Sequence, residues 1–498
     1  MENRFSLIDE PWIPVVGKGL LSLRTCVECR DPLQLGGTPI EKVSLFKFFQ
    51  ALCQSACTPS NIDTWKALGV EGLRKEVLSY LDGHHDQFWL YGDHPFLQFP
   101  QIAGKTKKVK KVNVSQLLTT APKDNTTILF PNQRERILSD SEKVLLLLTQ
   151  MGFAFGWKGA DNSFSLTKGY TKSKTAPVGP SLGRKGFLHS FFYEETLMET
   201  FYLNLLTKDD IDDMKVFSEG LGTAPWEQLP EGEDDSIAKA YRHSVMGRFI
   251  PLCRFMYYRD DGETCDYTEG LAYQSYNDGE YDLTCTADFS NPAAPHILWT
   301  DPEKRPWREL TSLLAFCVHG TSGWNNQQLR RTAEKLTFTE FDSINLWAGG
   351  LQVSYTSGES YLSGSNDYVE STFSIDRSSL EKTWFTNLQE EMRDLDKMEK
   401  KLFGSVKRYY TNLKAESSFA KAQASRASGI FWSLAEQNFP ELLEATASLD
   451  ASVRIRIRKQ NWEVVEAVYS QICPNSTARQ LAAWVTAKPF AGKILEEG

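Results

Sequence analysis

Two groups of residues have side chains and spacing that could hold a metal ion. In the first, His84, His85 and Asp86 are adjacent, and a histidine–aspartate pair is typical of metal-dependent phosphohydrolases. No spaced second set of histidines or aspartates completes a metal shell. A surface loop is therefore the preferred interpretation, and a metal-dependent nuclease that uses these three residues is the alternative enzyme hypothesis.

Four cysteines form the second group. Cys26 and Cys29 have the C-x-x-C spacing of a zinc-ligand pair, with Cys53 and Cys57 as possible further thiolates. The latter two fall in a stretch with apolar residues at helical spacing, where a buried free cysteine is common. We predict no metal and no cofactor. The sequence also lacks a Walker A motif, a G-x-S-x-G motif and a dinucleotide fingerprint, so we predict no enzyme activity.

Basic residues are gathered in three clusters, although the net charge of the chain is −9. The clusters are Lys105, Lys107, Lys108, Lys110 and Lys111; then Lys168, Lys172, Lys174, Arg184 and Lys185; then Arg454, Arg456, Arg458 and Lys459. A protein that coats nucleic acid non-specifically is usually basic overall. Any contact of this chain with phosphates is therefore expected to be local and shared with partner proteins.

The second and third clusters have features that favour nucleic-acid contact. The second cluster lies within 152–186, a glycine-rich stretch with little regular pattern. Glycine lets backbone N–H groups approach phosphates closely, and a loop of this length in a compact domain is usually functional or disordered. In the third cluster, Arg454 and Arg458 are four residues apart and share a helix face, which would form a phosphate-contacting stripe.

The stretch 347–362 has the pattern of a β-hairpin. Gly349-Gly350 is expected to break the chain, after which Leu351–Thr356 alternates apolar and polar residues as a strand does. Ser357-Gly358 has turn chemistry, and Glu359–Leu362 can return as the second strand. Two interpretations are open at this point: an ordinary surface hairpin, or a stiff finger that inserts at a DNA base step.

The composition is that of an ordinary globular protein. The chain has 498 residues, of which 41% are hydrophobic and 24% charged. No run of about 18 apolar residues predicts a membrane span, and the first residues do not have the pattern of a secretory signal. The nine scattered cysteines are typical of reduced thiols. We therefore expect a cytoplasmic protein.

Hydrophobic periodicity predicts an α+β fold with two domains. A large mixed α/β domain with hairpins and long loops is expected over residues 1–375, and a C-terminal helical bundle of the four-helix type over 376–498. Expected helices are Pro39–Ala56, Ser139–Met151, Phe191–Leu206, a long helix from Leu380 to Leu413, Ser418–Asn438, Val453–Ile472 and Thr477–Thr486. Lys208–Asp235 is predicted to be a loop, and Pro440 and Pro474 are predicted to end helices.

Several stretches resemble the large, CasA-type subunit of type I-E CRISPR Cascade complexes. They are Leu7–Val15 (LIDEPWIPV), Asp93–Gln98 (DHPFLQ), Phe130–Gln133 (FPNQ), Ala348–Gly350 with the hairpin that follows, and the C-terminal helical bundle. Each motif is short, but their order and spacing are specific, and together they run the length of the chain.

The resemblance implies a non-catalytic role in sensing DNA. Such a subunit recognises the protospacer-adjacent motif in double-stranded DNA, starts strand separation with a hairpin wedge and helps to recruit a helicase-nuclease. The implied partners are the backbone, handle-binding and small Cascade subunits, the CRISPR guide RNA, double-stranded target DNA and the helicase-nuclease, with no membrane. A scaffold that binds only proteins is the remaining alternative.

The resemblance also assigns roles to particular residues. The wedge and its flanking reader correspond to Ser354, Tyr355 and Thr356, with Gln352 as the alternative if the register is shifted; the glycine loop to Gly179, Gly183, Arg184 and Lys185; and the first loop, which meets the guide handle or DNA, to Phe130, Asn132 and Gln133. From their charge, contacts to the DNA backbone are expected at Lys107, Lys108, Lys110, Arg454 and Arg458.

The chain departs from the family pattern in three places. Tyr355 stands where the family has a glutamine; its ring can stack on a base pair, but the preferred motif is not predicted. The family's lysine finger is expected within 265–280, where this chain has no lysine, so Gln274 replaces it or the contact is absent. The cysteine quartet of some members has no full counterpart, which agrees with the prediction of no metal.

Overall fold

The fold is described from a computed structural model. The described residues are 3–103, 105, 110–118, 136–160, 162–173, 175–273, 282–291, 293–315, 323–339, 343–356, 359–362, 367–376, 382–448 and 450–495. The chain separates into two compact units, of which the first contains Met1–Pro306, Gly323–Glu340 and Asn345–Thr372 and the second contains the remaining segments. The boundary near residue 375 between two independently folding domains stays a prediction.

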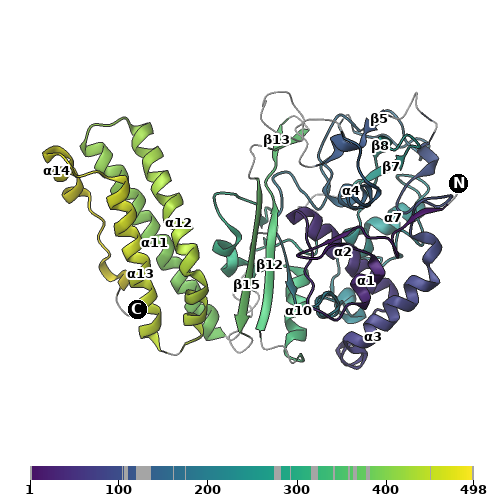
Figure 1. Ribbon diagram of the computed structural model, residues 1–498, viewed down its shortest axis with the longest axis horizontal. Helices are drawn as coiled ribbons and strands as arrows, with labels where there is room; N and C mark the ends of the chain where they lie inside the picture. Colours follow the sequence, from purple (N-terminus) through teal and green to yellow (C-terminus); the bar gives the residue numbers. More distant parts are fainter. Residues whose placement is uncertain are drawn as a thin grey trace. The chain divides into compact units, whose positions relative to one another are not determined.

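The first unit combines helices with small antiparallel sheets (Figure 1). Its helices are α1 (Leu23–Glu28), α2 (Pro39–Ala56), α3 (Ile62–Gly83), α4 (Asp140–Phe153), α5 (Leu197–Leu203), α6 (Lys208–Asp213), α7 (Ser236–Arg242), α8 (Met246–Phe249) and α10 (Gln327–Leu336). Its strands are β1 (Arg4–Ser6), β2 (Ile13–Val15), β3 (Gly19–Leu21), β4 (Trp89–Tyr91), β5 (Lys110–Asn113), β6 (His189–Tyr193), β7 (Arg254–Tyr258), β8 (Thr264–Glu269), β9 (Ala287–Asp288), β10 (His296–Ile297), β11 (Trp324–Asn325), β13 (Ser354–Thr356) and β14 (Glu359–Tyr361). Most of β12 (Ser343–Leu351) and of β15 (Tyr368–Asp376) also belongs to it.

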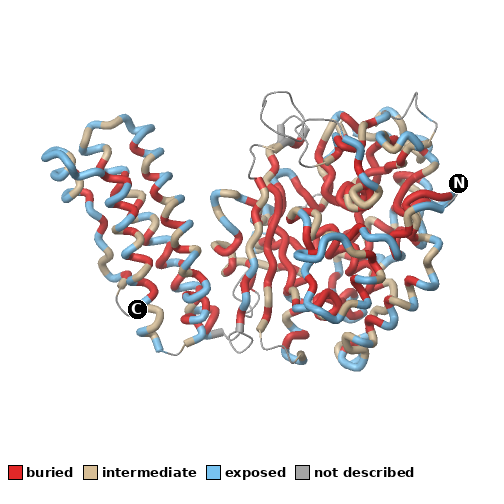
Figure 2. Tube along the Cα trace, in the orientation of Figure 1, coloured by how far each residue is buried: buried red, intermediate tan, exposed pale blue. Residues whose placement is uncertain are grey.

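A stack of aromatic rings joins α2 to the strand that precedes the hairpin. Phe46 on α2 stacks on Phe191 of β6, with ring centroids 3.9 Å apart, and Phe191 stacks on Trp347 of β12 at 4.9 Å. Trp347 and Phe191 also face each other in the antiparallel register of β12 and β6. Figure 2 shows the interior segments of this unit as buried. Burial of these large rings stabilises the folded unit and holds β12 in place against β6 and α2.

The second unit is mainly helical. Helices α11 (Lys382–Asn412), α12 (Ser417–Ala447) and α13 (Ala451–Ile472) run side by side, accompanied by α9 (Leu310–Leu313) and α14 (Ala478–Ala487) (Figure 1). Leu388, Phe431 and Val465 are fully buried between the long helices, as an amphipathic pattern requires. The predicted α+β class with C-terminal helices is confirmed. None of the helices in the described parts of the chain is long and apolar enough to span a membrane.

Two predicted boundaries are wrong in the first unit. The stretch Phe191–Leu206 does not begin as a helix, because its first residues belong to β6 and α5 begins only at Leu197. Periodicity could not separate the two, since a strand buried on both faces has a continuous apolar pattern. The predicted loop Lys208–Asp235 contains α6, which Thr207 starts through a capping box with Asp210.

Gly349 and Gly350 do not break the chain. Both lie inside β12, and neither has a positive φ. Glycine is needed at both positions because a side chain would not fit. A Cβ at Gly350 would lie 2.4 Å from the Phe187 carbonyl oxygen, and one at Gly349 would lie 2.9 Å from the Val369 carbonyl oxygen. In the second unit Pro440 does not end a helix either, because α12 continues through it to Ala447.

Candidate nucleic-acid interface

The predicted hairpin forms, and its second strand is anchored to another segment of the first unit. Strands β13 and β14 pair antiparallel, with Tyr355 opposite Ser360. The buried Ser360 donates its backbone N–H to the Gly156 carbonyl oxygen at 2.8 Å, and its hydroxyl oxygen accepts from the Gly156 N–H at 3.1 Å. An isolated two-stranded hairpin is marginal in water, so this anchor is what gives the hairpin a defined position.

The glycine loop, residues 179–186, is tightly folded. The Gly179 N–H donates to the Ala154 carbonyl at 2.7 Å, and the Gly183 N–H donates back to the Gly179 carbonyl at 3.0 Å. Gly183 has a φ of +69°, and a Cβ there would lie 2.4 Å from the Phe187 ring. Because only glycine takes this backbone conformation without strain and leaves room for the ring, the sequence specifies this turn locally.

The glycine loop and the strand leading to the hairpin are joined by backbone contacts. The Val353 N–H donates to the Lys185 carbonyl at 3.0 Å, and the Thr300 N–H donates to the Gly186 carbonyl at 2.8 Å. A Cβ at Gly186 would lie 1.6 Å from the Leu351 carbonyl oxygen. Two segments that are about 170 residues apart in the sequence therefore form one structural junction.

An open cavity of about 630 Å³ lies at this junction. It is lined by Arg184, Lys185, Trp299, Thr300, Asp301, Gln352, Val353 and Ser354. The Arg184 and Lys185 side chains are exposed, and Trp299 stacks on Phe187 with ring centroids 4.8 Å apart. The cavity thus combines two cations, the side chain of Gln352 and an aromatic residue, Trp299. Such groups can contact phosphates, base edges and a base face.

The structure brings four of the predicted site residues together: Arg184, Lys185, Gln352 and Ser354. Trp299 and Thr300 also line the cavity but were missed, because nothing in the local sequence connects them to the glycine loop. The backbones of Tyr355 and Thr356 belong to β13, and that of Lys110 to β5. The other assignments, Phe130, Asn132, Gln133, Lys107, Lys108 and Gln274, lie outside the described residues.

Two basic residues of the first two clusters, Lys111 and Lys172, are paired with carboxylates. Lys172 forms a buried ion pair with Glu233 at 2.9 Å, and Lys111 pairs with Asp261 at 3.1 Å. Burial by itself raises the pKa of Glu233, but the Lys172 ammonium and the backbone N–H groups of Leu166 and Thr167 together outweigh it and lower that pKa. Lys172 therefore stabilises the long loop instead of presenting its charge to a ligand.

The third cluster requires a correction. Arg458 is only 7% exposed and binds Glu391 through two hydrogen bonds of 2.8 and 2.7 Å, while Arg454 approaches the same carboxylate at 3.3 Å. The guanidinium of Arg458 therefore faces the bundle core. The sequence-based assignment of a phosphate-contacting stripe to Arg454 and Arg458 is dropped, because burial of the partner carboxylate fixes both side chains inward.

The candidate metal ligands do not converge in the described parts of the chain. His85 Nε2 contacts Asp9 at 2.9 Å, and His84 Nδ1 contacts the Tyr80 carbonyl at 2.9 Å. Neither these residues nor the cysteine quartet forms a group of three ligand atoms there. The nuclease alternative thus gains no support from this geometry.

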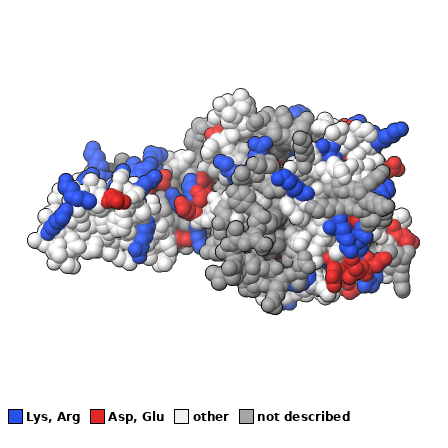
Figure 3. Space-filling model, turned by 90° about the horizontal axis from the view of Figure 1, so that it is seen from above, with Lys and Arg blue, Asp and Glu red and all other residues white. Residues whose placement is uncertain are grey.

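Charged side chains are scattered over the face of the molecule that Figure 3 shows. Figure 3 shows separate basic side chains on the helical unit, with acidic ones between and beside them. A continuous basic face is not seen in this view, which agrees with the net charge of −9. The cations at the cavity are therefore a local feature.

The chain matches one family along most of its length. The family model for CRISPR-associated protein Cse1 matches residues 6–469. A CasA/Cse1 protein of Thermus thermophilus is 27% identical over 338 residues, which cover 63% of this chain and 60% of that relative. The match thus covers less than two thirds of the length of this relative.

Solved structures share the fold. Cse1 of Thermobifida fusca superposes with a TM-score of 0.77 at 18% identity, covering 99% of this chain and 98% of that one. A chain of a CRISPR RNA-guided surveillance complex gives a TM-score of 0.71 at 15% identity, covering 98% of this chain and 99% of that one. At these identities the likeness concerns the fold alone.

Proposed function

The chain belongs to the CRISPR-associated Cse1 family, and from this membership we propose that it is a non-catalytic subunit of an RNA-guided CRISPR surveillance complex. In that role it recognises a short motif beside the target in double-stranded DNA, while pairing with the guide RNA reads the target itself. Its partners are the other Cascade subunits, the guide RNA and the target duplex. The likeness of its fold to a chain of such a complex supports the proposal.

The observation that carries the proposal is the junction between the glycine loop and the hairpin. Arg184, Lys185 and Gln352 line one cavity there, beside Trp299. The two cations would meet phosphate oxygens and fix the register of the duplex, whereas the Gln352 amide can both donate to and accept from base edges. The hydrogen bond that the Val353 N–H donates to the Lys185 carbonyl holds the two parts in one geometry.

The hairpin next to this cavity is proposed to act as a wedge. Its first strand carries Tyr355, opposite Ser360 in the β13–β14 register, and Ser360 anchors the hairpin to Gly156. An anchored, stiff hairpin can insert at a base step and unstack it, which starts strand separation. The opened complex would then offer a surface to the helicase-nuclease.

The test uses the assembled complex and a gel shift with two duplexes, one with the adjacent motif and one with it replaced. Arg184→Ala combined with Lys185→Ala should weaken binding of both duplexes, and the slope of log affinity against log salt should fall by about 2. Gln352→Ala should instead reduce the ratio of the affinities for the two duplexes. Lys75→Ala combined with Lys215→Ala is the matched control, because both are exposed lysines outside the cavity.

Two results would contradict the proposal. The control pair could lower the slope as much as the cavity pair, which would make the cavity cations ordinary surface charge. Gln352→Ala could also leave the ratio between the duplexes unchanged. The protein-only scaffold would then be the better interpretation of the chain.

A further inference from the structure

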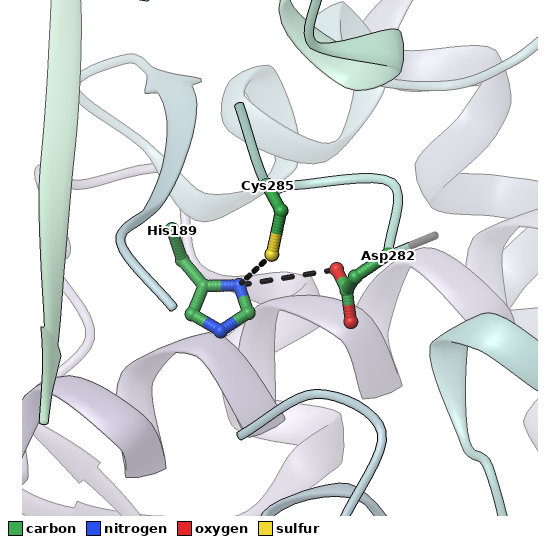
Figure 4. Close-up of side chains that lie close together, drawn as sticks. All are labelled: His189, Asp282 and Cys285. Atoms are coloured by element: carbon green, nitrogen blue, oxygen red, sulfur yellow. Dashed lines mark hydrogen bonds and ion pairs between the residues drawn. The ribbon is translucent and has the colours of Figure 1, made fainter. Parts of the chain in front are cut away.

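A buried cluster of polar side chains lies directly beneath the glycine loop. Lys47 comes from α2, His189 from β6, and Asp282 and Cys285 from the segment before β9; Figure 4 shows the last three. All four are at most 4% exposed. Charged and polar groups that are buried to this degree are costly unless each has a partner, so the question is what holds them there.

Lys47 connects the cluster to the loop. Its ammonium forms an ion pair with Asp282 and donates to the Ser181 hydroxyl at 2.8 Å, with the Arg248 carbonyl at 3.4 Å. Burial alone would raise the pKa of Asp282, but the Lys47 ammonium, together with His189 and the Ser181 hydroxyl, outweighs it and lowers that pKa to about 2. The pair is therefore charge-balanced, and the third residue of the glycine loop, Ser181, is buried against it.

His189 holds the same loop residue by its backbone. Its Nε2 lies 2.8 Å from the Ser181 carbonyl oxygen. Burial lowers the pKa of His189 to about 4, so the ring is neutral near pH 7, and its proton is on Nε2 because a carbonyl can only accept. Nδ1 is then the acceptor, with the Cys285 thiol at 3.6 Å as its neighbouring donor, while the Thr284 hydroxyl, 2.8 Å from Nδ1, donates its single proton to Asp282 Oδ1.

His189, Asp282 and Cys285 are also residue types that bind metal ions, and their ligand atoms lie within 4.8 Å of one another. Two contacts argue against a metal. The Thr284 hydroxyl is 2.8 Å from both His189 Nδ1 and Asp282 Oδ1, where a metal would have to bind, and the Lys47 ammonium neutralises Asp282. A divalent cation next to a buried ammonium would be strongly repelled.

Resting on the proposed DNA-reading role of the loop, we propose that Lys47, Asp282 and His189 form a positioning network for the glycine loop. The network holds Ser181 by its hydroxyl and by its carbonyl, while the Ser181 N–H donates to the Gly152 carbonyl at 3.0 Å. All three polar groups of one residue are thus fixed. Arg184 and Lys185 follow three and four residues later, immediately before the contact with the hairpin strand.

Hydrogen exchange on the full chain without DNA tests the positioning directly. Ser181→Ala removes the hydroxyl that Lys47 binds, and protection should fall about tenfold at the amides of Leu182, Gly183 and Val353. The first two bond within the loop and the third bonds to Lys185. Amides in the middle of α4 should keep their protection.

Ser44→Ala is the matched control. Ser44 is also buried and lines the same small cavity as Lys47 and Ser181, but its hydroxyl donates to Ile40 within α2. This variant should leave the three reporter amides unchanged. If both variants act alike, or if protection falls evenly through the unit, the cluster is ordinary core and the proposal is overturned.

The second measurement uses the assembled complex and two variants of His189. His189→Gln keeps a donor for the Ser181 carbonyl and should largely retain motif discrimination, whereas His189→Leu should reduce it several-fold. Equal loss of motif discrimination in both variants would overturn a role through Ser181. Finding one equivalent of zinc bound to the purified chain would show that these residues form a metal site and would overturn the network. If Ser181→Ala lowers amide protection as expected but motif discrimination does not change in either His189 variant, the positioning is supported and the DNA-reading role of the loop is overturned.

Discussion

Gly186 is the residue at which a single added methyl group should separate the loop from the hairpin strand. Its φ is +84°, and a Cβ would lie 1.6 Å from the Leu351 carbonyl oxygen. Gly186→Ala should therefore lower the free energy of unfolding by about 2–4 kcal/mol and abolish motif-specific binding. Chemical denaturation of the chain and a gel shift of the complex measure the two effects.

Gly169 provides a control for the backbone strain. It has nearly the same φ, +82°, but nothing lies within 4 Å of the position its Cβ would take. Gly169→Ala should cost only the conformational strain, about 1 kcal/mol, and leave DNA binding intact. Equal losses at both glycines would mean that the close approach to Leu351 is unimportant.

Tyr355 tests the wedge at the scale of one side chain. Unstacking a base step costs a few kcal/mol, and the guide RNA cannot pair until that step opens. Tyr355→Ala should slow strand opening on a linear duplex, measured with a fluorescent base analogue at the first protospacer position. The defect should shrink on negatively supercoiled or pre-melted DNA, which supplies the opening energy independently. Equal slowing on intact and pre-melted duplexes would leave an ordinary surface hairpin.

At the scale of elements, a buried ion pair joins two long helices of the bundle. Arg458 on α13 binds Glu391 on α11, and both side chains are less than 10% exposed. Arg458→Ala removes two charge-assisted hydrogen bonds and leaves the buried Glu391 with Arg454 as its partner at 3.3 Å, so it should lower the stability of the bundle by about 2 kcal/mol. The salt dependence of DNA binding should not change.

Arg456 is the matched control, two residues away on the same helix. Its pair with Glu441 measures 3.1 Å, but the side chains are 62% and 47% exposed. Arg456→Ala should cost about 0.5 kcal/mol or less. Urea unfolding compares the two variants, and similar midpoints would show that burial does not distinguish the pairs.

At the scale of the whole molecule, net charge sets how the chain meets DNA. The chain carries −9 overall, with exposed cations at Arg184 and Lys185 near the cavity. The isolated protein should bind duplex DNA weakly and without motif preference, while specific binding should need the assembled complex, because partner subunits supply most of the phosphate neutralisation. A salt titration of both forms checks this. Tight, motif-dependent binding by the chain alone would contradict it.

The buried His189 predicts how the stability of the whole unit depends on pH. Its pKa falls from 6.5 to about 4 on folding, chiefly through burial, so between these values the unfolded chain binds a proton that the folded chain excludes. Stability should fall as pH drops through that window, by up to about 1.4 kcal/mol per pH unit. Urea unfolding at several pH values should give a smaller slope for His189→Gln. An unchanged slope would assign the acid sensitivity to other groups.

The sequence by itself determined the features that depend on neighbouring residues. Helical periodicity was enough for α2, α4 and α13, and alternation with a Ser-Gly turn was enough for the hairpin strands β13 and β14. The glycines around Arg184 and Lys185 marked a loop because their backbone requirements are local. Short motifs in a fixed order were enough to indicate the family.

Only the tertiary structure decided which of these features meet. It joined Gly186 to Leu351 and Lys185 to Val353, turned Arg458 toward Glu391, and showed that Gly349 and Gly350 are small because they pack inside a strand. It also brought Lys47, His189 and Asp282 beneath Ser181. These contacts join residues far apart in the sequence, and their energies depend on burial and partner geometry, which no local pattern of residues contains.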